Sequence, residues 1–182
     1  MLLIRSWPAD PPPRHACCED QIRRVLTAPF DYAPLCALGD DVLHLDWDIA
    51  VSPEDLATFA ASARRQPGQV LVGPYRTYPG SLFGADPVPR ELPGPVWTAK
   101  VYADDREWSM HYVQPGDPVA HLFGFGMVYL PAGLLARWAE QFPGAKMGDM
   151  EFSGWHYRIA GPARICWAVH PVHLNYPPPV EL

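Results

Sequence analysis

Two aspartates, Asp46 and Asp48, follow a short apolar run at residues 42–45 and have the types and spacing that metal chemistry needs. In an extended segment, residues two apart point to the same side, so both carboxylates would face one region of space. Carboxylate oxygens suit Mg²⁺ or Mn²⁺, and proteins usually hold Mg²⁺ through one or two carboxylates together with substrate phosphates. The spacing therefore predicts a divalent metal site for a phosphate-bearing substrate.

A helix is predicted directly after this pair. Ser52 has the residue type of an N-cap, and Pro53 suits the first helical position. Apolar residues then recur at helical spacing, at Leu56, Phe59, Ala60 and Ala63. Open α/β sheets bind ligands at such a junction of strand and helix. A solvent-exposed turn rich in Asp is the alternative interpretation.

A second acidic segment, residues 148–158, carries Asp149 and Glu151. A carboxylate at the rim of an active site can remove the proton from an attacking hydroxyl, and Trp155 in the same segment has an aromatic face that could stack on a sugar ring. The alternative is that Asp149 caps a helix beginning near Met150, because Asp favours N-caps and acidic residues favour the first turn.

Two histidines follow a buried strand expected at residues 165–169. His170 leaves this strand directly, and His173 lies three residues further on. Imidazole is an acceptable ligand beside carboxylate and phosphate oxygens, so either histidine could complete the metal site, with His170 the preferred candidate. An ordinary hydrogen-bonded histidine is the alternative for both. No other cluster of ligand residues has zinc spacing.

Taken in order, these motifs resemble the GT-A glycosyltransferases. Residues 42–49 resemble their Asp-x-Asp motif, and residues 148–158 resemble the acidic motif that follows their Gly-rich strand and helix, here residues 121–130 and the helix after Pro131. The resemblance covers most of residues 43–176. Gly148 stands where many relatives have Glu, and fewer residues precede the first motif than in the family.

The resemblance implies a metal-dependent glycosyltransferase that uses Mn²⁺ or Mg²⁺ and a nucleotide-sugar donor, with a UDP-sugar among the candidates. Asp48 would ligate the metal, and Asp46 would contact the metal or the donor's ribose and sugar. His170 or His173 would be the late histidine of the metal site.

The same resemblance gives Asp149 the place of the base in an inverting transfer, with Glu151 or Trp155 helping to place the acceptor. A glycan, a lipid-linked sugar, a protein and a modified base in DNA are all candidate acceptors. The net charge of −6 gives no electrostatic reason for tight binding to a polyphosphate backbone.

The elements that must position these residues fit one domain over residues 1–182, with a proline-rich tail at 177–182. Strands are predicted at residues 2–6, 42–45 and 69–73, and helices at 18–28 and after Ser52. Their alternation predicts a Rossmann-like α/β fold, a mainly parallel sheet flanked by helices, with a mixed-sheet region late in the chain. No run approaches the ~18 apolar residues of a membrane span, which predicts a cytoplasmic protein.

Three other functions fit the same carboxylates. A metal-dependent nucleotidyl- or phosphotransferase would use the paired aspartates in a similar way. A glycosidase could use two carboxylates without a metal. A noncatalytic sugar- or protein-binding relative of the same fold would agree with the short N-terminal part and with Gly148.

Overall fold

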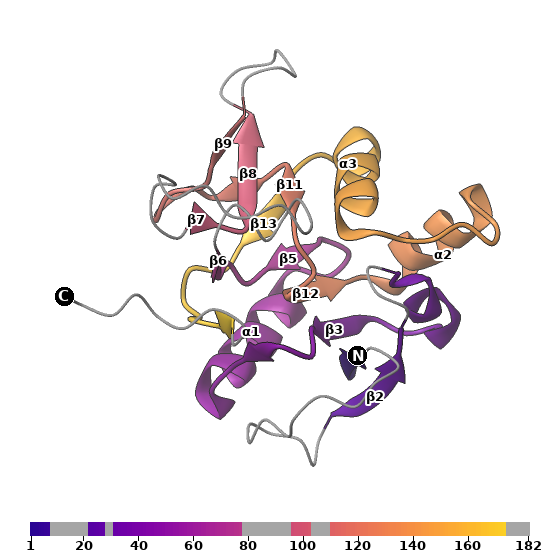
Figure 1. Cartoon of the computed structure of the whole chain (residues 1–182), viewed down its shortest axis with the longest axis horizontal. Coiled ribbons are helices and arrows are strands. Elements are labelled where there is room, and N and C mark those ends of the chain that lie inside the picture. The colour runs from indigo at the N-terminus through magenta and orange to yellow at the C-terminus, as the bar shows by residue number, and fades with distance from the viewer. Residues whose placement is uncertain (8–21, 28–30, 78–95, 103–109, 174–182) are drawn as a thin grey trace, which may run out of the picture.

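A mixed sheet of seven strands forms the centre of the computed structural model, which describes residues 1–7, 22–27, 31–77, 96–102 and 110–173 (Figure 1). From one edge to the other, the strands are β2 (Arg23–Leu26), β1 (Leu2–Trp7), β3 (Val42–Leu45), β12 (Met127–Leu130), β5 (Leu71–Val72), β13 (Ala163–Ile165) and β10 (Val119–Ala120).

The sheet is mixed because one central strand runs against its neighbours. β1 is parallel to β2 and β3, and β13 is parallel to β5. β12 lies between β3 and β5 and is antiparallel to both, and β10 is antiparallel to β13. The predicted α/β fold is confirmed as a mixed sheet flanked by helices, in which three strand pairings are parallel and three are antiparallel.

Helix α1 (Pro53–Arg65) covers one face of the sheet. The Ser52 hydroxyl caps it by accepting the N–H of Asp55 at 3.0 Å, as the sequence predicts. Phe59 and Ala63 are fully buried against the sheet residues of this face, which include Leu43, Leu45, Leu71 and Met127. Apolar periodicity and a polar cap therefore fix this helix locally.

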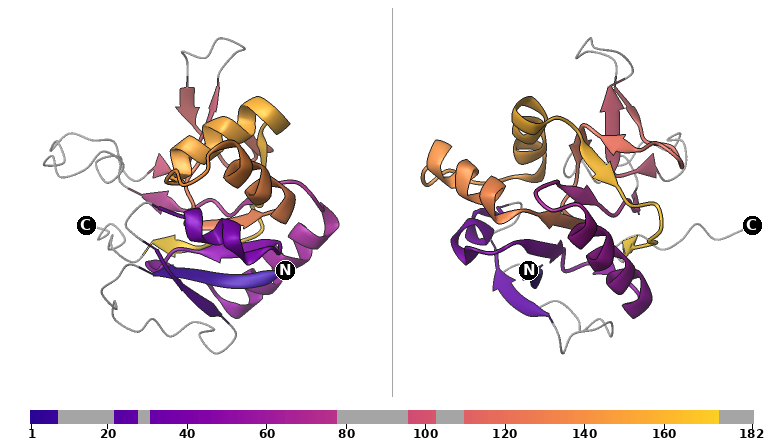
Figure 2. Two further views of the ribbon diagram at one scale, coloured as in Figure 1. Left: turned by 90° about the vertical axis from the view of Figure 1, so that its right-hand side faces the viewer. Right: turned by 180° about the vertical axis from the view of Figure 1, so that it is seen from behind.

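Helices α2 (Ala132–Gln141) and α3 (Asp149–Ala160) lie on the opposite side of the sheet from α1 (Figure 2). A short 3-10 helix, η2 (Ala33–Leu38), packs in the same hydrophobic cluster as these two helices. The helix expected after Pro131 is confirmed as α2, in which Leu134, Leu135 and Trp138 are buried and Phe142 packs against them.

Two predicted elements are wrong. The helix expected at residues 18–28 is instead β2 over residues 23–26, which pairs in parallel with β1 and gives hydrogen-bond partners to its second edge. The strand expected at residues 165–169 lies earlier, as β13, and residues 167–168 form a turn. Residues 18–21 and the proline-rich tail lie outside the described residues.

Smaller sheets surround the central one. β11 (Leu122–Phe123), β8 (Ala99–Tyr102) and β9 (Met110–Tyr112) form a three-stranded sheet, β6 (Arg76–Thr77) pairs with β7 (Val96–Trp97), and β4 (Ile49–Ala50) pairs with β14 (Val172–His173). Among the described residues, no helix combines the length and the apolar character needed to cross a membrane.

Candidate active site

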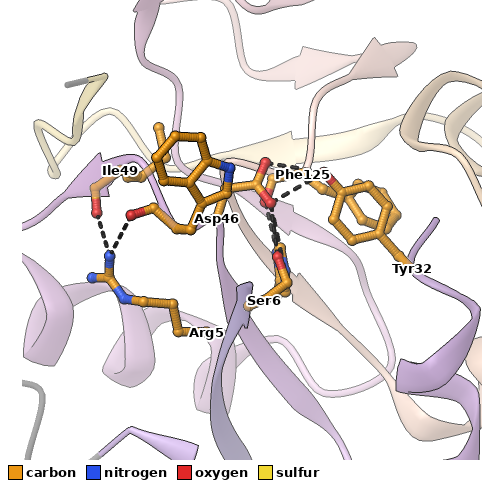
Figure 3. A network of polar contacts seen from close by, with 8 residues as sticks. Arg5, Ser6, Tyr32, Asp46, Ile49 and Phe125 are labelled. Carbon is orange, nitrogen blue, oxygen red and sulfur yellow. Dashed lines mark hydrogen bonds and ion pairs between the residues drawn. The ribbon is translucent and has the colours of Figure 1, made fainter. Parts of the chain in front are cut away.

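Asp46 lies just after β3, beside the end of β1, and its carboxylate is held by two hydroxyl groups. The Ser6 hydroxyl donates to Oδ1 at 2.9 Å. The Tyr32 hydroxyl lies 3.1 Å from Oδ1 and 3.0 Å from Oδ2 (Figure 3). Because β1 and β3 are parallel neighbours, their carboxyl ends bring Ser6 and Asp46 together. This carboxylate is therefore preorganised by the protein.

The segment that follows Asp46 is a turn, which corrects the extended geometry predicted for the Asp pair. The strand ends at Leu45, and the Ile49 N–H donates to the Asp46 carbonyl at 3.2 Å. Arg5, only 1% exposed, fixes this turn by donating from Nη1 to the carbonyls of Trp47 and Ile49, each at 3.2 Å (Figure 3). The two carboxylates consequently have different surroundings.

Asp48 faces His173. β14 pairs antiparallel with β4 so that His173 lies opposite Ile49, one residue beyond Asp48. The His173 Nε2 atom is 3.2 Å from Asp48 Oδ2, and both side chains keep some exposure, 14% and 12% respectively. The ring of Tyr75 stacks on the His173 imidazole, with centroids 5.6 Å apart and planes inclined by 12°.

The structure brings His173, and not His170, to the first motif. The His170 side chain is exposed, and its backbone N–H donates to Asp55 Oδ2 at 3.3 Å. The preference for His170 rested on its place directly after the predicted strand, and that strand ends earlier than predicted. Pairing of β14 with β4, more than 100 residues apart in sequence, is what selects His173.

Tyr75 is the main residue of the site that the sequence did not indicate. It is 8% exposed, and burial raises its pKa above the ordinary value, with further contributions from the charges of Asp46, Asp149 and Asp48. The phenol therefore lies among all three carboxylates.

The Gly-rich segment makes room for this ring. A Cβ atom at Gly126 would collide with the ring carbons of Tyr75 and lie 2.6 Å from its hydroxyl oxygen. A Cβ at Gly124 would lie 3.1 Å from the same hydroxyl oxygen and 3.5 Å from Asp149 Oδ2. The phenol and the Asp149 carboxylate thus border one small space. Close approach requires glycine at position 126, whereas a Cβ at position 124 would only crowd the hydroxyl.

Asp149 is the first residue of α3 and reaches the site from the side of the sheet opposite to α1. The N-cap is Gly148, which has no side chain to cap the helix, and Asp149 Oδ1 accepts the N–H of the next residue, Met150, at 2.7 Å. The alternative prediction that Asp149 is the N-cap is therefore wrong. Burial raises the pKa of Asp149 to about 6, the Met150 N–H opposes this rise, and the charges of Asp46 and Glu151 add to it. The coupling to Asp46 relates the two predicted motifs electrostatically.

Asp46 is perturbed in the same direction. Burial and the charge of Asp48 raise its pKa to about 6, although the hydrogen bonds from Ser6 and Tyr32 and the nearby His173 lower it. Two carboxyl groups of the site therefore titrate near neutral pH. Such perturbed pairs are frequent at functional sites.

His44, on β3, is a second residue that its sequence context did not single out. It is fully buried, and its Nδ1 lies 2.7 Å from the Phe125 carbonyl oxygen, so Nδ1 carries the proton. Burial lowers the pKa of His44 to about 4, which keeps it neutral. Its Nε2 lies 3.8 Å from Asp46 Oδ1. With the proton on Nδ1, Nε2 has none to donate, so His44 lies near the first carboxylate without a hydrogen bond to it.

Asp48 and His173 form an ion-pair contact, and both residue types can ligate a divalent metal. Adjacent ligands of an octahedral ion lie about 3.0 Å apart when each is about 2.1 Å from the metal, which is close to the 3.2 Å between their facing atoms. Within the described ranges, no group of three or more His, Cys, Asp or Glu side chains is placed to hold a metal. The residues therefore fit an ion that takes its other ligands from phosphate oxygens and water.

The two remaining predicted site residues are Glu151 and Trp155. Glu151 is exposed on α3, and its carboxylate folds back over Gly148, where a Cβ atom would collide with it. Trp155 is 3% exposed, packs edge-to-face on Trp138 at 5.3 Å and donates its indole N–H to Gln141 at 2.8 Å. The prediction that Trp155 contacts a substrate is wrong, because its side chain belongs to the core.

Neither a protein-family model nor a curated protein matches the sequence. Among solved structures, the chain is similar to the crystal structure of A197 from STIV, with a TM-score of 0.47 and 12% sequence identity over 94% of this chain and 81% of that chain. A likeness at this score carries no weight for fold or function, which leaves the geometry of the site as the basis for a functional assignment.

Proposed function

We propose that this protein is a metal-dependent glycosyltransferase of the GT-A type, which transfers a sugar from a nucleotide-sugar donor to an acceptor hydroxyl. One observation carries the proposal: carboxylates and a histidine from three distant parts of the chain, Asp46 and Asp48, Asp149, and His173, surround the buried ring of Tyr75. Local helix capping or solvation of a turn would not require this convergence.

Asp48 and His173 would hold Mn²⁺ or Mg²⁺ at the exposed edge of the site. When bound, the ion would act as a Lewis acid that stabilises the negative charge of the leaving diphosphate. A cation also suits a place where the charge of Asp48 raises the pKa of Asp46, because it relieves the repulsion between carboxylates.

Asp46 is better suited to the donor's hydroxyl groups than to the metal. Its Oδ1 already accepts from Ser6 and Tyr32, and Oδ2 accepts from Tyr32 alone. A carboxylate oxygen has two lone pairs, so Oδ2 keeps one position for a further donor. A ribose or sugar hydroxyl would fill that position, while Ser6 and Tyr32 hold the carboxylate in orientation.

Asp149 would remove the proton from the acceptor hydroxyl in an inverting transfer. A base works best when its pKa lies near the working pH, and the pKa of about 6 makes Asp149 a stronger base than an ordinary carboxylate while leaving it largely ionised at pH 7. The hydroxyl of Tyr75 borders the same space and would donate to the acceptor oxygen to orient it.

Calorimetric titration of a panel of nucleotide sugars, with Mn²⁺ and then with EDTA, tests the proposal. The expected result is metal-dependent binding of at least one donor to the native protein and its loss in Asp48→Asn, with Glu54→Gln, an exposed first-turn carboxylate of α1, as the matched control. Absence of binding across the panel would refute the donor site and favour a noncatalytic relative.

A further inference from the structure

A cavity lies at the edge of the sheet opposite the candidate active site. It has a volume of about 270 Å³ and its lining includes Gln69, Val70, Val119, His156, Ala160 and Arg164. Gln69 and Val70 precede β5, whereas Tyr75 follows it, so this strand runs from the cavity toward the active site. The cavity is therefore separate from the carboxylates described above.

Helix α3 also runs between the candidate active site and the cavity. Asp149 is its first residue, and His156 and Ala160 line the cavity from its second half. At a rise of about 1.5 Å per residue, the ends of this helix are about 16 Å apart. Figure 1 shows α3 leading directly into β13, which supplies Arg164. One rigid element thus joins the cavity to the proposed base.

His156 is the unusual residue of this cavity. It is 3% exposed and contacts the rings of Phe123 and Phe152, at centroid distances of 6.1 and 6.4 Å. Its Nδ1 is buried without a hydrogen-bond partner in the described part of the chain. An unpaired buried polar atom costs about 1–3 kcal/mol, and because Nδ1 is covered by protein atoms, a polar ligand group in the cavity would remove that cost only with a turn of the imidazole ring.

The other polar groups favour an anion. Arg164 is exposed at the cavity and Gln69 is exposed beside it. A guanidinium binds phosphate or carboxylate through paired N–H donors, and an amide can bond hydroxyl groups. The apolar part of the lining, Val70, Val119 and Ala160, suits a short carbon body. The volume is just below the range of about 300–1,000 Å³ for ligand pockets, which restricts the cavity to a small ligand.

We propose that this cavity is a second binding site, for a small phosphorylated or carboxylated polyol, whose anionic group contacts Arg164 and whose hydroxyls contact His156 and Gln69. The site goes beyond the proposed transferase activity and needs neither the metal nor the nucleotide-sugar donor. Its ligand would stabilise the C-terminal half of α3, the helix that carries Asp149.

Titration of the full chain with sn-glycerol 3-phosphate in EDTA tests this site, followed by the side-chain NMR signals of His156 and Arg164. The expected result is saturable shifts of both signals with a dissociation constant of about 1 mM or tighter. Inorganic phosphate, which lacks the carbon body, and glycerol, which lacks the charge, should each bind at least about tenfold more weakly, a difference of about 1.4 kcal/mol.

Arg164→Gln should weaken the binding at least about tenfold, as expected for loss of a charge-assisted contact. Arg158→Gln removes a neighbouring exposed charge of α3 outside the cavity lining and should change it less than about twofold. No saturable shift up to about 10 mM, an equal effect of the two variants, or shifts confined to the carboxylate site would each overturn the proposal. Since no metal or nucleotide is present, failure here leaves the donor titration as a separate result.

Discussion

Replacing Asp149 by Asn should stabilise the protein at neutral and alkaline pH. The amide keeps an oxygen that can accept the Met150 N–H, but it removes a carboxylate whose pKa is raised, mainly by burial, from 3.8 to about 6. A raised pKa means that the folded state disfavours the ionised form. The native carboxylate therefore lowers the free energy of unfolding at the pH where it would act as a base.

The size of the effect follows from the two pKa values. A difference of about 2.2 in pKa corresponds to about 3 kcal/mol. The stabilising contribution of the protonated carboxyl group is complete below pH 3.8 and is lost as the pH rises through about 6. Between pH 4.5 and pH 8, about 2 kcal/mol of this loss should be seen.

Urea unfolding of the native protein and of Asp149→Asn, measured at several pH values, gives the comparison. We expect nearly equal stability at pH 4 and a variant that is about 2–3 kcal/mol more stable at pH 8. Glu151→Gln removes an exposed carboxylate from the same helical turn and should change stability by about 0.5 kcal/mol or less.

A variant that is less stable than the native protein at pH 8 would refute this reasoning. So would a difference that does not depend on pH. Either result would mean that Asp149 mainly stabilises the first turn of α3, a contribution of about 0.3–1 kcal/mol, and that its burial carries no cost for which a function must account.

Three further substitutions test other parts of the site. Gly126→Ala should destabilise the protein by about 1–3 kcal/mol in urea unfolding, because the new Cβ collides with the buried Tyr75 ring. Gly133→Ala, with open space around it, should be neutral or slightly stabilising, and equal effects of the two substitutions would contradict the packing argument. His173→Gln should weaken Mn²⁺ binding about tenfold or more in a calorimetric titration, and His170→Gln should not, so the reverse order would assign the metal to the other histidine. Tyr32→Phe removes a hydrogen bond that lowers the pKa of Asp46, so that pKa should rise above about 6. The free energy of unfolding of the variant should fall by about 1–3 kcal/mol at pH 8 and by less at pH 5. An equal fall at both pH values would contradict the proposed hydrogen bond.

Local signals in the sequence were sufficient where one element determines its own structure. The cap at Ser52 and the apolar face of α1 required only neighbouring residues, and the same holds for α2. Local signals gave the wrong structure for residues 22–26. Their apolar spacing also fits a helix, and only the pairing with β1 makes them a strand.

The candidate site was predicted in part. Asp46, Asp48 and Asp149 could be found because carboxylates of suitable spacing follow strands or begin helices. The choice of His173 depends on the pairing of β14 with β4, and Tyr75 depends on the space left by Gly124 and Gly126 on another strand. Such long-range contacts leave no local pattern, although a conspicuous Gly-x-Gly segment is a signal of close approach.

Trp155 shows the opposite error, a residue that the sequence placed at the site and that belongs to the core. Aromatic residues beside an acidic motif suit both sugar stacking and core packing, and the position on α3 decides between them. Trp155 shares a buried face of α3 with Phe152, and this face packs on Trp138 of α2. Its neighbour in the motif, Glu151, points outward. The sequence around them does not separate these two outcomes.

The most direct test of the central claim is identification of the product released from a bound nucleotide sugar in the presence of Mn²⁺. The account predicts a nucleoside diphosphate and a transferred or hydrolysed sugar, with release abolished in Asp149→Asn while the donor still binds. Release of pyrophosphate would instead indicate a nucleotidyltransferase. Full release by Asp149→Asn would contradict its role as the base, and turnover unaffected by EDTA would contradict the metal site of Asp48 and His173.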